Sequence, residues 1–482
     1  MPNKKEKFYI TSSIAYTNAF PHIGFSQELI QADVLARYHR LLGESVFFLT
    51  GTDEHGQKVV KAAEKTKKTP EKFVSEISNK FKDLKQTLNL SNDDFIRTTD
   101  KKRHWPAVKK VWLKLEKNRD IYKKEYKGLY CVGCEAFIKE KDLVDGKCPF
   151  HKRIPDTVKE ENYFFRLSRY SKQIEKIIKK GELKIIPESR KNEILSFIKQ
   201  GVDDISCSRS RENLKWGIPV PNDNTQTIYI WLEALINYIS GLDYAKDRNK
   251  FKRFWPADVH CVGKDIFKFH SLLWPAILLS LELKLPKAIF VHGFITVDRK
   301  KMSKSLGNVV DPFKLVQKYG VDAVRYFLLR EIPSTEDGDF TEQKFEARYN
   351  SDLASGIGNF ISRVITMAGK LKAENKNLKS AFQNIKLKIQ ITKTRKNYQK
   401  AMDSFKFNEA LVSIWRLISF CDHYIEKERP WEEKQNQKQV INDLLLALSE
   451  IAKLLEPFLP ETSENIFEQL KTKKAKPLFP RI

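Results

Sequence analysis

The chain has 482 residues, 41% of them hydrophobic, so it can bury several cores, and its length suggests roughly three domains. Its 87 Lys and Arg against 61 Asp and Glu give a formal net charge of +26, which favours polyanionic partners such as nucleic acid. No run approaches the ~18 apolar residues of a membrane span, and the first residues lack the apolar segment of a secretory signal. We therefore expect a multidomain, cytoplasmic protein without membrane contact.

The first part of the chain alternates strand-like and helix-like patterns up to about residue 115. A strand is predicted over 7–14, a helix over 24–42 and a second strand over 44–51. This β-α-β order indicates an α/β fold with a parallel sheet. Ligands of such sheets bind beyond the carboxyl ends of the strands, so the residues that follow each strand are the candidates for function.

A lysine-rich, cysteine-bearing segment interrupts the alternation from about residue 117 to 225. Strand patterns then resume in VHCVGKD (259–265) and KAIFVHGFITV (287–297), which predicts one sheet split by an insert. From about residue 351 onward the chain shows only amphipathic helical patterns, such as 408–428 and 440–459. That part is predicted to be a helical bundle.

Small and polar residues follow the predicted strands. His22 and Gly24 stand where the first helix begins, Asp53 follows the second strand, and Gly263 and Asp265 follow a later one. A glycine at a helix N-terminus lets a phosphate approach the backbone, and a carboxylate at this edge suits an ammonium group. Taken singly, each of these residues is explained as well by a cap, a turn or packing.

An intact KMSKS segment, Lys301 to Ser305, follows the last predicted strand. Together with HIGF, His22 to Phe25, it resembles the paired signature of the class I aminoacyl-tRNA synthetases, in the same order and at a similar separation. The resemblance implies that His22, Lys301 and Lys304 are catalytic. A mobile lysine such as Lys304 can stabilise the charge that builds on the phosphates when ATP activates an amino acid.

The same resemblance assigns the nucleotide site. His22 and Lys304 would hold the phosphates of ATP, Gly24 would let ATP lie against the backbone, and Gly263 with Asp265 would meet the nucleoside. It also implies that Mg²⁺ accompanies ATP.

Within this class, nearly every segment is similar to the methionyl-tRNA synthetases, from YITSSIAYTNAFPHIG to VHGFITVDRKKMSKSLGN. Helical spacing independently places Trp231, Ala234, Leu235 and Tyr238 on one face, and Ile266, His270 and Leu273 on another. Such stripes are usually core. The resemblance implies that Asp53 binds the methionine amino group, and that the side chain is surrounded by Ile14, Tyr16, Trp231, Ala234, Leu235, Tyr238, Ile266 and His270. Leu235 replaces a proline of some relatives.

Cysteines in the insert are spaced as zinc ligands. Cys131, Cys134, Cys148 and His151 form two short hooks separated by a hairpin-sized loop, which suits one tetrahedral structural Zn²⁺ with soft ligands. The other cysteines, Cys207, Cys261 and Cys421, are expected to be ordinary buried thiols. In the related synthetases such a knuckle lies near the acceptor end of tRNA.

Three residues of the predicted bundle match the anticodon-reading positions of the family. Asn359 and Arg363 are four apart on one predicted helix, and Trp431 lies on a distant segment. Amide and guanidinium groups can hydrogen-bond unpaired bases, and an indole can stack on one. The resemblance therefore implies an all-α anticodon-binding bundle for tRNA(Met) with the anticodon CAU.

One position departs from the class signature. Phe25 stands where the class usually has a second histidine, and a phenyl ring cannot donate a hydrogen bond to phosphate. On a helix that begins near Gly24, Phe25 shares a face with Leu29, Ala32 and Ala36, which is a core stripe.

Alternative functions remain open on the sequence. Leucyl, isoleucyl and valyl synthetases share the class motifs but carry a much larger insert, and a cysteinyl enzyme places its zinc ligands in the amino-acid pocket. A non-catalytic RNA-binding paralogue is opposed by the intact loop lysines. A nucleotidyltransferase acting on a small acid is opposed by the predicted tRNA-binding bundle.

The expected organisation is a Rossmann-type sheet split by a zinc-bearing connective insert and followed by the anticodon-binding bundle. The predicted segments are 1–116 and 226–294 for the catalytic halves, 117–225 for the insert, 295–350 for the KMSKS and stem-contact region, and 351–482 for the bundle. The expected partners are tRNA, ATP and L-methionine, and the expected state is a monomer.

Overall fold

The computed structural model describes residues 6–131, 136–138, 140–149, 152–246, 249–302, 307–370, 382–432 and 436–482. The chain divides into two compact units. Unit 1 comprises Met1–Pro21, Leu42–Lys85 and Ser91–Val291, and unit 2 comprises His22–Leu41, Gln86–Leu90 and His292–Ile482.

Unit 1 is built on a six-stranded sheet with the strand order β3-β2-β1-β12-β13-β7. Its strands are β1 (Lys7–Tyr16), β2 (Ser45–Asp53), β3 (Asp94–Arg97), β7 (Lys184–Ile186), β12 (Val259–Gly263) and β13 (Ala288–His292). The pairings of β1 with β2 and β12, of β2 with β3 and of β13 with β7 are parallel. The predicted α/β fold with a parallel sheet is therefore confirmed.

The edge strand β7 differs from expectation. It lies inside the interval 117–225 that we assigned to the insert, yet it pairs in parallel with β13 as part of the main sheet. The helices beside it are α5 (Ser171–Lys180) and α6 (Glu188–Lys199). Only Ile185 and Ile186 mark this strand as apolar, and the lysines around it conceal a segment of three residues from any search for periodicity.

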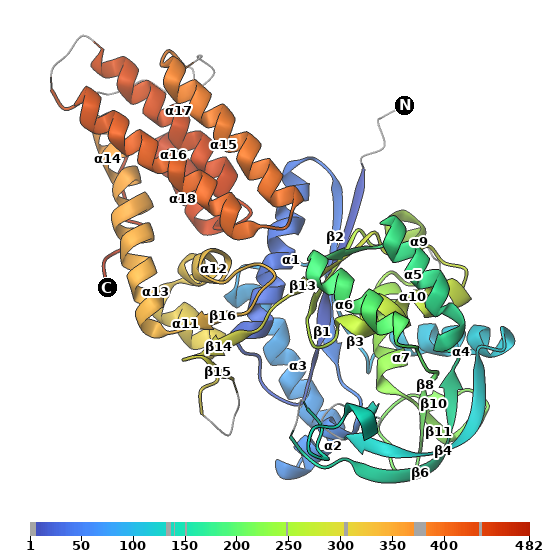
Figure 1. The fold of residues 1–482 in the computed structure, drawn as a ribbon. Coiled ribbons are helices and arrows are strands. Elements are labelled where there is room, and N and C mark those ends of the chain that lie inside the picture. Colours follow the sequence, from blue (N-terminus) through green and yellow to red (C-terminus); the bar gives the residue numbers. More distant parts are fainter. Residues whose placement is uncertain are drawn as a thin grey trace. The chain divides into compact units, whose positions relative to one another are not determined.

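The rest of the insert forms two small antiparallel sheets. One has the order β5-β4-β6-β8, and β4 and β6 pair along almost their whole length, as Figure 1 shows. Its strands are β4 (Ile121–Cys131), β5 (Ala136–Ile138), β6 (Asp156–Phe165) and β8 (Ile205–Ser206). The second sheet has the order β10-β11-β9. Its strands are β9 (Ser208–Ser210), β10 (Pro219–Val220) and β11 (Asp223–Ile228).

Helices and sheet of unit 1 share one apolar core, in which Trp112, Trp274, Tyr9 and Tyr238 are the bulkiest fully buried side chains. The other helices of the unit are α2 (Gln57–Lys65), α3 (Pro70–Thr87), α4 (His104–Lys117), α7 (Ile230–Leu235), α8 (Asn237–Ser240), α9 (Asn249–Phe254) and α10 (Trp274–Ser280), with the π-helical turn η3 (Phe269–Leu273) before α10. Burial of aromatic area of this kind supplies most of the stabilisation of a mixed fold.

Unit 2 begins with α1 (Ile23–Leu41) and a sheet of order β15-β14-β16. The strands are β14 (Ile295–Val297), β15 (Lys300–Lys301) and β16 (Gly338–Phe340). We read KAIFVHGFITV as one strand-like run, but it contains β13 and β14, which belong to different sheets. The break lies at Gly293, where an added Cβ would be 2.1 Å from the Glu336 carbonyl oxygen.

The remainder of unit 2 is helical. It contains α11 (Pro312–Tyr319), α12 (Val321–Arg330), α13 (Glu342–Arg348), the π-helical segment η5 (Tyr349–Gly358), α14 (Asn359–Lys370), α15 (Ile385–Asp403), α16 (Phe407–Glu428), α17 (Gln437–Leu455) and α18 (Pro460–Thr472). Helices α14 to α18 run side by side (Figure 1). After residue 351 the described part of the chain contains no strand, so the predicted helical bundle is confirmed.

A fully buried arginine ties the parts of unit 2 together. Arg325 of α12 donates to Asp33 of α1 at 2.8 Å, and to the carbonyls of Leu88, Pro457 and Phe458 at 3.0, 3.0 and 2.7 Å. Both charges of the Arg325–Asp33 pair are 0% exposed. A buried ion pair contributes little net stability, but removing one partner leaves an uncompensated charge at a cost of ~3–5 kcal/mol.

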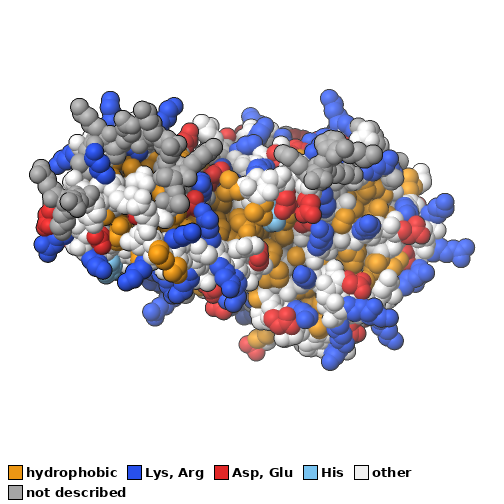
Figure 2. All heavy atoms as spheres, turned by 90° about the horizontal axis from the view of Figure 1, so that it is seen from above, with side chains coloured by type: hydrophobic (Ala, Val, Ile, Leu, Met, Phe, Trp, Pro, Cys, Tyr) orange, Lys and Arg blue, Asp and Glu red, His pale blue; other side chains and the backbone are white. Residues whose placement is uncertain are grey.

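The surface carries the strong positive charge of the sequence. Lys and Arg side chains are scattered over the face seen in Figure 2 and do not form a single patch. None of the helices in the described ranges is both long and apolar enough to cross a membrane.

Candidate active site

The central strand β1 brings polar and aromatic residues to one edge of the six-stranded sheet. In the parallel register Tyr16 is the partner of Asp53 on β2, and Ser12 is the partner of Cys261 on β12, whose last residue is Gly263. The Asp53 carbonyl accepts hydrogen bonds from the backbone and hydroxyl of Thr17 at 3.0 and 3.1 Å. The sequence-predicted residues at these strand ends therefore meet at one sheet edge.

A tyrosine and a histidine join the two predicted stripes. The Tyr238 hydroxyl lies 2.7 Å from His270 Nε2, and His270 Nδ1 lies 3.0 Å from the Ile266 carbonyl. A carbonyl can only accept, so Nδ1 carries a proton, and in the neutral ring Nε2 accepts from Tyr238. With a neutral imidazole the pair presents no formal charge and suits an uncharged ligand group.

The helices that carry these stripes are less regular than predicted. Residues 231–238 form two short helices, and Ile266 lies in a turn before the π-helical η3. A π turn inserts one residue, so the expected continuous face from Ile266 to Leu273 is wrong, although the Ile266–His270 contact is kept. Ile14, Trp231 and Ile266 are partly buried beside the core, whereas Leu235 is fully packed inside it.

Trp231 forms the flattest aromatic contact of this region. Its ring stacks on Phe269 with centroids 3.8 Å apart and an interplanar angle of 7°. Trp231 Nε1 is buried and has no hydrogen-bond acceptor among the described residues. The indole therefore supplies an apolar wall with one unused donor.

A second layer fixes Tyr238 from behind. His260 Nδ1 lies 2.8 Å from the Thr11 hydroxyl, Trp274 Nε1 donates to His260 Nε2 at 3.2 Å, and the His260 ring centre is 4.2 Å from that of Tyr238. The Tyr238 carbonyl accepts from the Tyr9 hydroxyl at 2.7 Å. Burial lowers the pKa of His260 well below its ordinary value, so this ring is a neutral part of the support.

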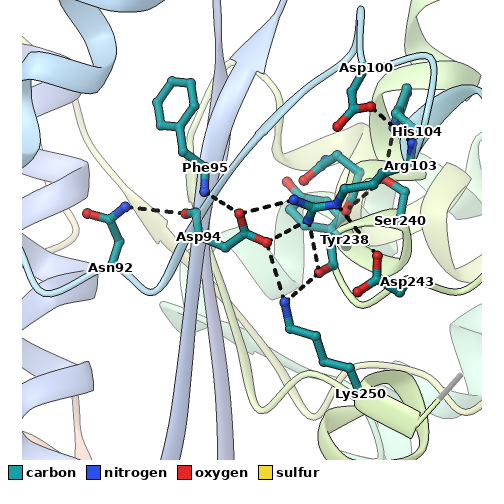
Figure 3. Close-up of polar contacts among 12 residues, drawn as sticks. Asn92, Asp94, Phe95, Asp100, Arg103, His104, Tyr238, Ser240, Asp243 and Lys250 are labelled. Carbon is teal, nitrogen blue, oxygen red and sulfur yellow. Dashed lines mark hydrogen bonds and ion pairs between the residues drawn. The ribbon is translucent and has the colours of Figure 1, made fainter. Parts of the chain in front are cut away.

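A cluster of acidic and basic side chains holds the residue that follows α8, and Figure 3 shows the ion pairs of Asp94 within it. Asp94 accepts from Arg103 at 2.6 Å and from Lys250 at 3.4 Å, and both bases also donate to the Gly241 carbonyl. A Cβ on Gly241 would lie 2.6 Å from the Leu49 side chain, so only glycine lets the chain approach β2 this closely. Although burial raises the pKa of Asp94, the Arg103 hydrogen bond and charge outweigh it and hold the pKa below its ordinary value.

In unit 2, His22 caps the helix that it precedes. The Gly24 backbone N–H donates to His22 Nδ1 at 3.1 Å, so in the neutral ring the proton is on Nε2. Burial lowers the pKa of His22, which favours that neutral form. A Cβ on Gly24 would lie 2.9 Å from His22 Cε1, so glycine is needed for the cap.

The two signature segments lie close together in unit 2. The Ile23 backbone N–H donates to the Val310 carbonyl at 3.2 Å, and a Cβ on Gly24 would be 3.5 Å from Met302 Cε. Lys301 is exposed at the end of β15. Lys304 lies outside the described residues.

The other predicted nucleotide residues stand at the end of β12 and in the expected first turn of α1. Gly263 is buried and Asp265 is exposed in the turn that follows it. Phe25 is half-buried, whereas Leu29, Ala32 and Ala36 of its expected core stripe are buried.

The predicted zinc ligands are only partly described. Cys131 ends β4 and Cys148 follows a Val144–Lys147 bridge, and both side chains are buried. The Cys148 carbonyl accepts from the Lys152 backbone N–H at 2.7 Å. Cys134 and His151 lie outside the described residues. Among the residues whose positions are described, no group of three or more candidate ligands occurs.

The predicted anticodon residues lie on α14 and after α16. Arg363 pairs with Glu426 at 2.6 Å and approaches Asp422 at 3.9 Å, and Trp431 is 51% exposed. Asn359 lines a cavity of about 310 Å³ together with Ser355, Ser362, Phe479 and Arg481, among others. The exposed indole and the polar cavity can stack on and hydrogen-bond unpaired bases.

Comparison with known proteins decides the family. The model of class I tRNA synthetases (M) matches residues 8–154 and 141–365, and that of the anticodon-binding domain of tRNA ligases matches 386–479. A methionine–tRNA ligase of Caldanaerobacter subterraneus subsp. tengcongensis is 44% identical over 97% of this chain and 74% of its own length. The chain belongs to the methionyl-tRNA synthetases. It is therefore a class I methionine–tRNA ligase, as we expected from the resemblance.

Other methionyl-tRNA synthetases agree over the same extent. The Rickettsia felis enzyme is 42% identical over 98% of this chain and 94% of its own length. A structure of the Mycobacterium tuberculosis enzyme in complex with methionyl-adenylate has a TM-score of 0.90 at 36% identity, covering 96% of this chain and 93% of that one. The similarity thus includes both units.

Residues of this synthetase that the sequence analysis missed lie directly beside those it found. Phe269 stacks on Trp231, while Glu233 and His55 form a buried pair between α7 and the segment after β2. The signal for Glu233 was present, because an acid inside an otherwise apolar helical stretch needs a buried partner. Phe269 carried no signal, because an apolar residue is expected there in any case.

Two buried histidines make the folding of this synthetase sensitive to acid. Burial, aided by the neighbouring His55 and Arg103, lowers the pKa of His104 from 6.5 to about 3, and burial holds the pKa of His260 well below 6.5. Above pH 6.5 both rings are neutral in the folded and the unfolded chain. Below it the unfolded chain takes up protons that the folded chain cannot, so the free energy of unfolding decreases.

We predict that each ring contributes ~1.4 kcal/mol of lost stability per pH unit as the pH falls from about 6 to 4. Urea unfolding of the wild type and of His104→Gln across this range measures the effect, and the variant should show the shallower slope by that amount. Equal slopes in the two proteins would mean that the folded chain protonates His104 at an ordinary pH.

Proposed function

We propose that the protein activates L-methionine with ATP and transfers it to the 3′ end of tRNA(Met). In the first step a carboxylate oxygen of methionine attacks the α-phosphorus of ATP, and pyrophosphate leaves with the bond electrons. In the second step a hydroxyl of the terminal ribose attacks the carbonyl of methionyl-adenylate, and AMP leaves. The observation that carries this proposal is the meeting of Tyr16, Asp53 and Gly263 at one sheet edge beside the Tyr238–His270 pair.

The methionine side chain is enclosed by apolar and aromatic residues. Trp231, Tyr238 and Ile266 supply walls, and Ile14, Tyr16, Ala234 and Leu235 shape the remainder. Contacts between a thioether and an aromatic ring are worth ~0.3–1.5 kcal/mol each. The uncharged Tyr238–His270 pair suits the thioether end, and Asp53 compensates the ammonium group at the other end.

The two signature segments are proposed to supply the groups that act on the phosphates. His22, with its proton on Nε2, is a neutral donor, and the first backbone amides of α1 add further donors. Lys301 and Lys304 supply positive charge as it is needed in the transition state. Mg²⁺ bound with ATP would neutralise phosphate charge. Gly24 allows close approach of ATP, and Gly263 with Asp265 receive the nucleoside.

Phe25 leaves this arrangement with one fewer donor than the class signature. A phenyl ring cannot take over the role of a second histidine. His22 and Lys304 must therefore supply more of the stabilisation of the phosphate charge.

ATP–pyrophosphate exchange with each amino acid tests the function, and we predict activity with methionine alone. Lys304→Ala should lower the exchange rate more than tenfold with little change in methionine affinity, since ~1.4 kcal/mol of transition-state stabilisation is one decade. The matched control is Lys300→Ala, an exposed neighbour on β15. No exchange with any amino acid would favour a non-catalytic tRNA-binding paralogue, and equal rates in both variants would remove the loop from the mechanism.

The knuckle of the insert is proposed to hold one structural zinc. Buried thiols at Cys131 and Cys148 fit soft tetrahedral ligation, with Cys134 and His151 proposed to complete the set. Bound zinc would cross-link the two hooks of the knuckle. Its role is folding of the insert, and no step of the reaction passes through it.

We predict one tightly bound zinc per chain, lost in Cys148→Ser and retained in the control Cys421→Ser, which changes a buried thiol of the bundle. Elemental analysis of protein purified without chelators measures the metal, and melting with and without chelator measures its effect on stability. Metal-free wild-type protein would contradict this assignment.

The bundle is proposed to read the CAU anticodon through Asn359, Arg363 and Trp431. The exposed indole of Trp431 can stack on one base, and the cavity beside Asn359 has the size and polarity to receive another. Arg363 would exchange its contacts with Glu426 and Asp422 for contacts with RNA. A cytoplasmic monomer is the simplest form in which this enzyme meets tRNA.

We predict that Trp431→Ala weakens tRNA aminoacylation about tenfold or more in kcat/KM while exchange without tRNA is unchanged, because stacking is worth ~1–3 kcal/mol per base. Phe467→Ala is the matched control, since it removes another exposed ring of the bundle, on α18. Equal losses of exchange and aminoacylation in Trp431→Ala would instead identify the indole as part of the fold.

A further inference from the structure

A buried, hydrogen-bonded Glu–His pair lies directly behind the proposed methionine site. Glu233 stands on α7 between Trp231 and Ala234 and is 0% exposed, while His55, two residues after Asp53, is 2% exposed. His55 Nδ1 and Glu233 Oε1 are in direct hydrogen-bond contact. The pair therefore joins the α7 wall of the pocket to the segment that carries Asp53.

His55 is the hydrogen-bond partner of the Glu233 carboxyl group among the described residues. His104 Nε2 is 3.9 Å from Glu233, but His104 Nδ1 lies 2.9 Å from the Ser240 hydroxyl, which itself donates to the Asn237 carbonyl (His104 and Ser240 are labelled in Figure 3). The Ser240 oxygen therefore accepts from Nδ1, and the neutral His104 ring presents only a lone pair at Nε2. His104 cannot compensate the carboxylate.

His55 is held in an aromatic enclosure. The rings of Trp216 and Trp105 lie 5.3 and 6.1 Å from its ring, centre to centre. Their indole N–H groups are committed elsewhere, Trp216 to the Glu54 carbonyl at 2.6 Å and Trp105 to the Thr98 carbonyl at 3.1 Å. Packing therefore limits the ring of His55, and its hydrogen bond to Glu233 fixes the remaining rotation.

The two residues before His55 are tied down on the other side. The Asp53 carbonyl accepts from Thr17, and the fully buried Glu54 carboxylate accepts from Thr52 at 2.8 Å and from Arg97 at 2.6 Å. Residues 53–55 therefore leave β2 as a segment whose ends are both fixed. The far end of this segment, His55, is held by its contact with Glu233 on α7.

We propose that Glu233, acting through His55, is a positioning residue for recognition of the methionine amino group, because it holds segment 53–55 so that Asp53 faces the ammonium. This inference rests on the proposed function of Asp53. A leucine at 233 would fill a comparable volume without the desolvation cost of a buried carboxylate. Burial of a paired acid adds little to the stability of a fold, so the geometry assigns this hydrogen-bonded pair to positioning.

Isosteric substitution tests the proposal with little change of volume. In Glu233→Gln we expect the KM for methionine to rise about tenfold in exchange, with kcat within about threefold and the KM for ATP unchanged. His55→Phe tests the same contact from the other side, because it keeps a ring between the two indoles but removes the Nδ1 hydrogen bond to Glu233. It should give the same pattern even if Glu233→Gln fails to fold.

Two inhibitors separate positioning of Asp53 from support of the thioether walls. Methioninol keeps the amino group, and 4-(methylthio)butanoate is methionine without it. Glu233→Gln should weaken inhibition by methioninol about tenfold and leave inhibition by 4-(methylthio)butanoate unchanged. Equal weakening of both, or of neither, would overturn the proposal.

A double-mutant cycle with Asp53→Asn completes the test. If Glu233 acts through Asp53, adding Glu233→Gln to Asp53→Asn should change the methionine KM less than twofold, and a further tenfold rise would overturn the proposal. Asp53→Asn with unchanged methionine affinity would instead disprove the proposed role of Asp53. The control is Asp120→Asn, a buried carboxylate bonded to Arg169 and Ser280, expected to lower melting temperature without selective loss of methionine affinity.

Discussion

Parallel pairing of β1 with β2 on one side and β12 on the other is the constraint on which the proposed methionine site depends. It brings Tyr16 beside Asp53, and Ser12 beside Cys261 near the end of β12, although these segments are far apart in sequence. A shift of one residue in this register would turn each of these side chains to the opposite face of the sheet. The register of the sheet thus places residues of three strands next to one another at one edge.

The support of the site is layered, and each layer is neutral where it touches the proposed thioether pocket. Tyr238 donates to a histidine whose other nitrogen is bonded to a carbonyl, and His260 below it is kept uncharged by burial. Ionisable groups appear one layer further out, at the ion pair of Asp94 with Arg103 and at the hydrogen-bonded pair of Glu233 with His55. An apolar ligand end therefore meets a surface that costs little to desolvate, while the rigidity comes from the polar contacts behind it.

Sequence patterns predicted the long periodic helices and strands and the segments that carry distinctive motifs. The strand at β1, the helix at α1 and the bundle after residue 351 followed from periodicity, and the paired signature segments located both motifs of unit 2. The strand β7 was not predicted, because three residues are too few to show a hydrophobic periodicity. The π turn was not predicted, because one inserted residue leaves no trace in the composition. Glu233 was missed although an acid in an apolar helical stretch is a signal for a buried partner. That this partner is His55, two residues after Asp53, depends on a tertiary contact that no local sequence pattern encodes.

The buried guanidinium of Arg325 bears on how separable the parts of the chain are. Family boundaries divide it into a synthetase portion ending at residue 365 and an anticodon-binding portion beginning at 386. Yet Arg325 lies in the first portion and takes two of its acceptors, the carbonyls of Pro457 and Phe458, from the second. A chain cut between the portions would keep a desolvated cation and lose part of its hydrogen bonding. The helical bundle is therefore not an independent domain that could be exchanged for another. The interior around α1 and α12 needs the carbonyls of Pro457 and Phe458 to complete the hydrogen bonding of Arg325.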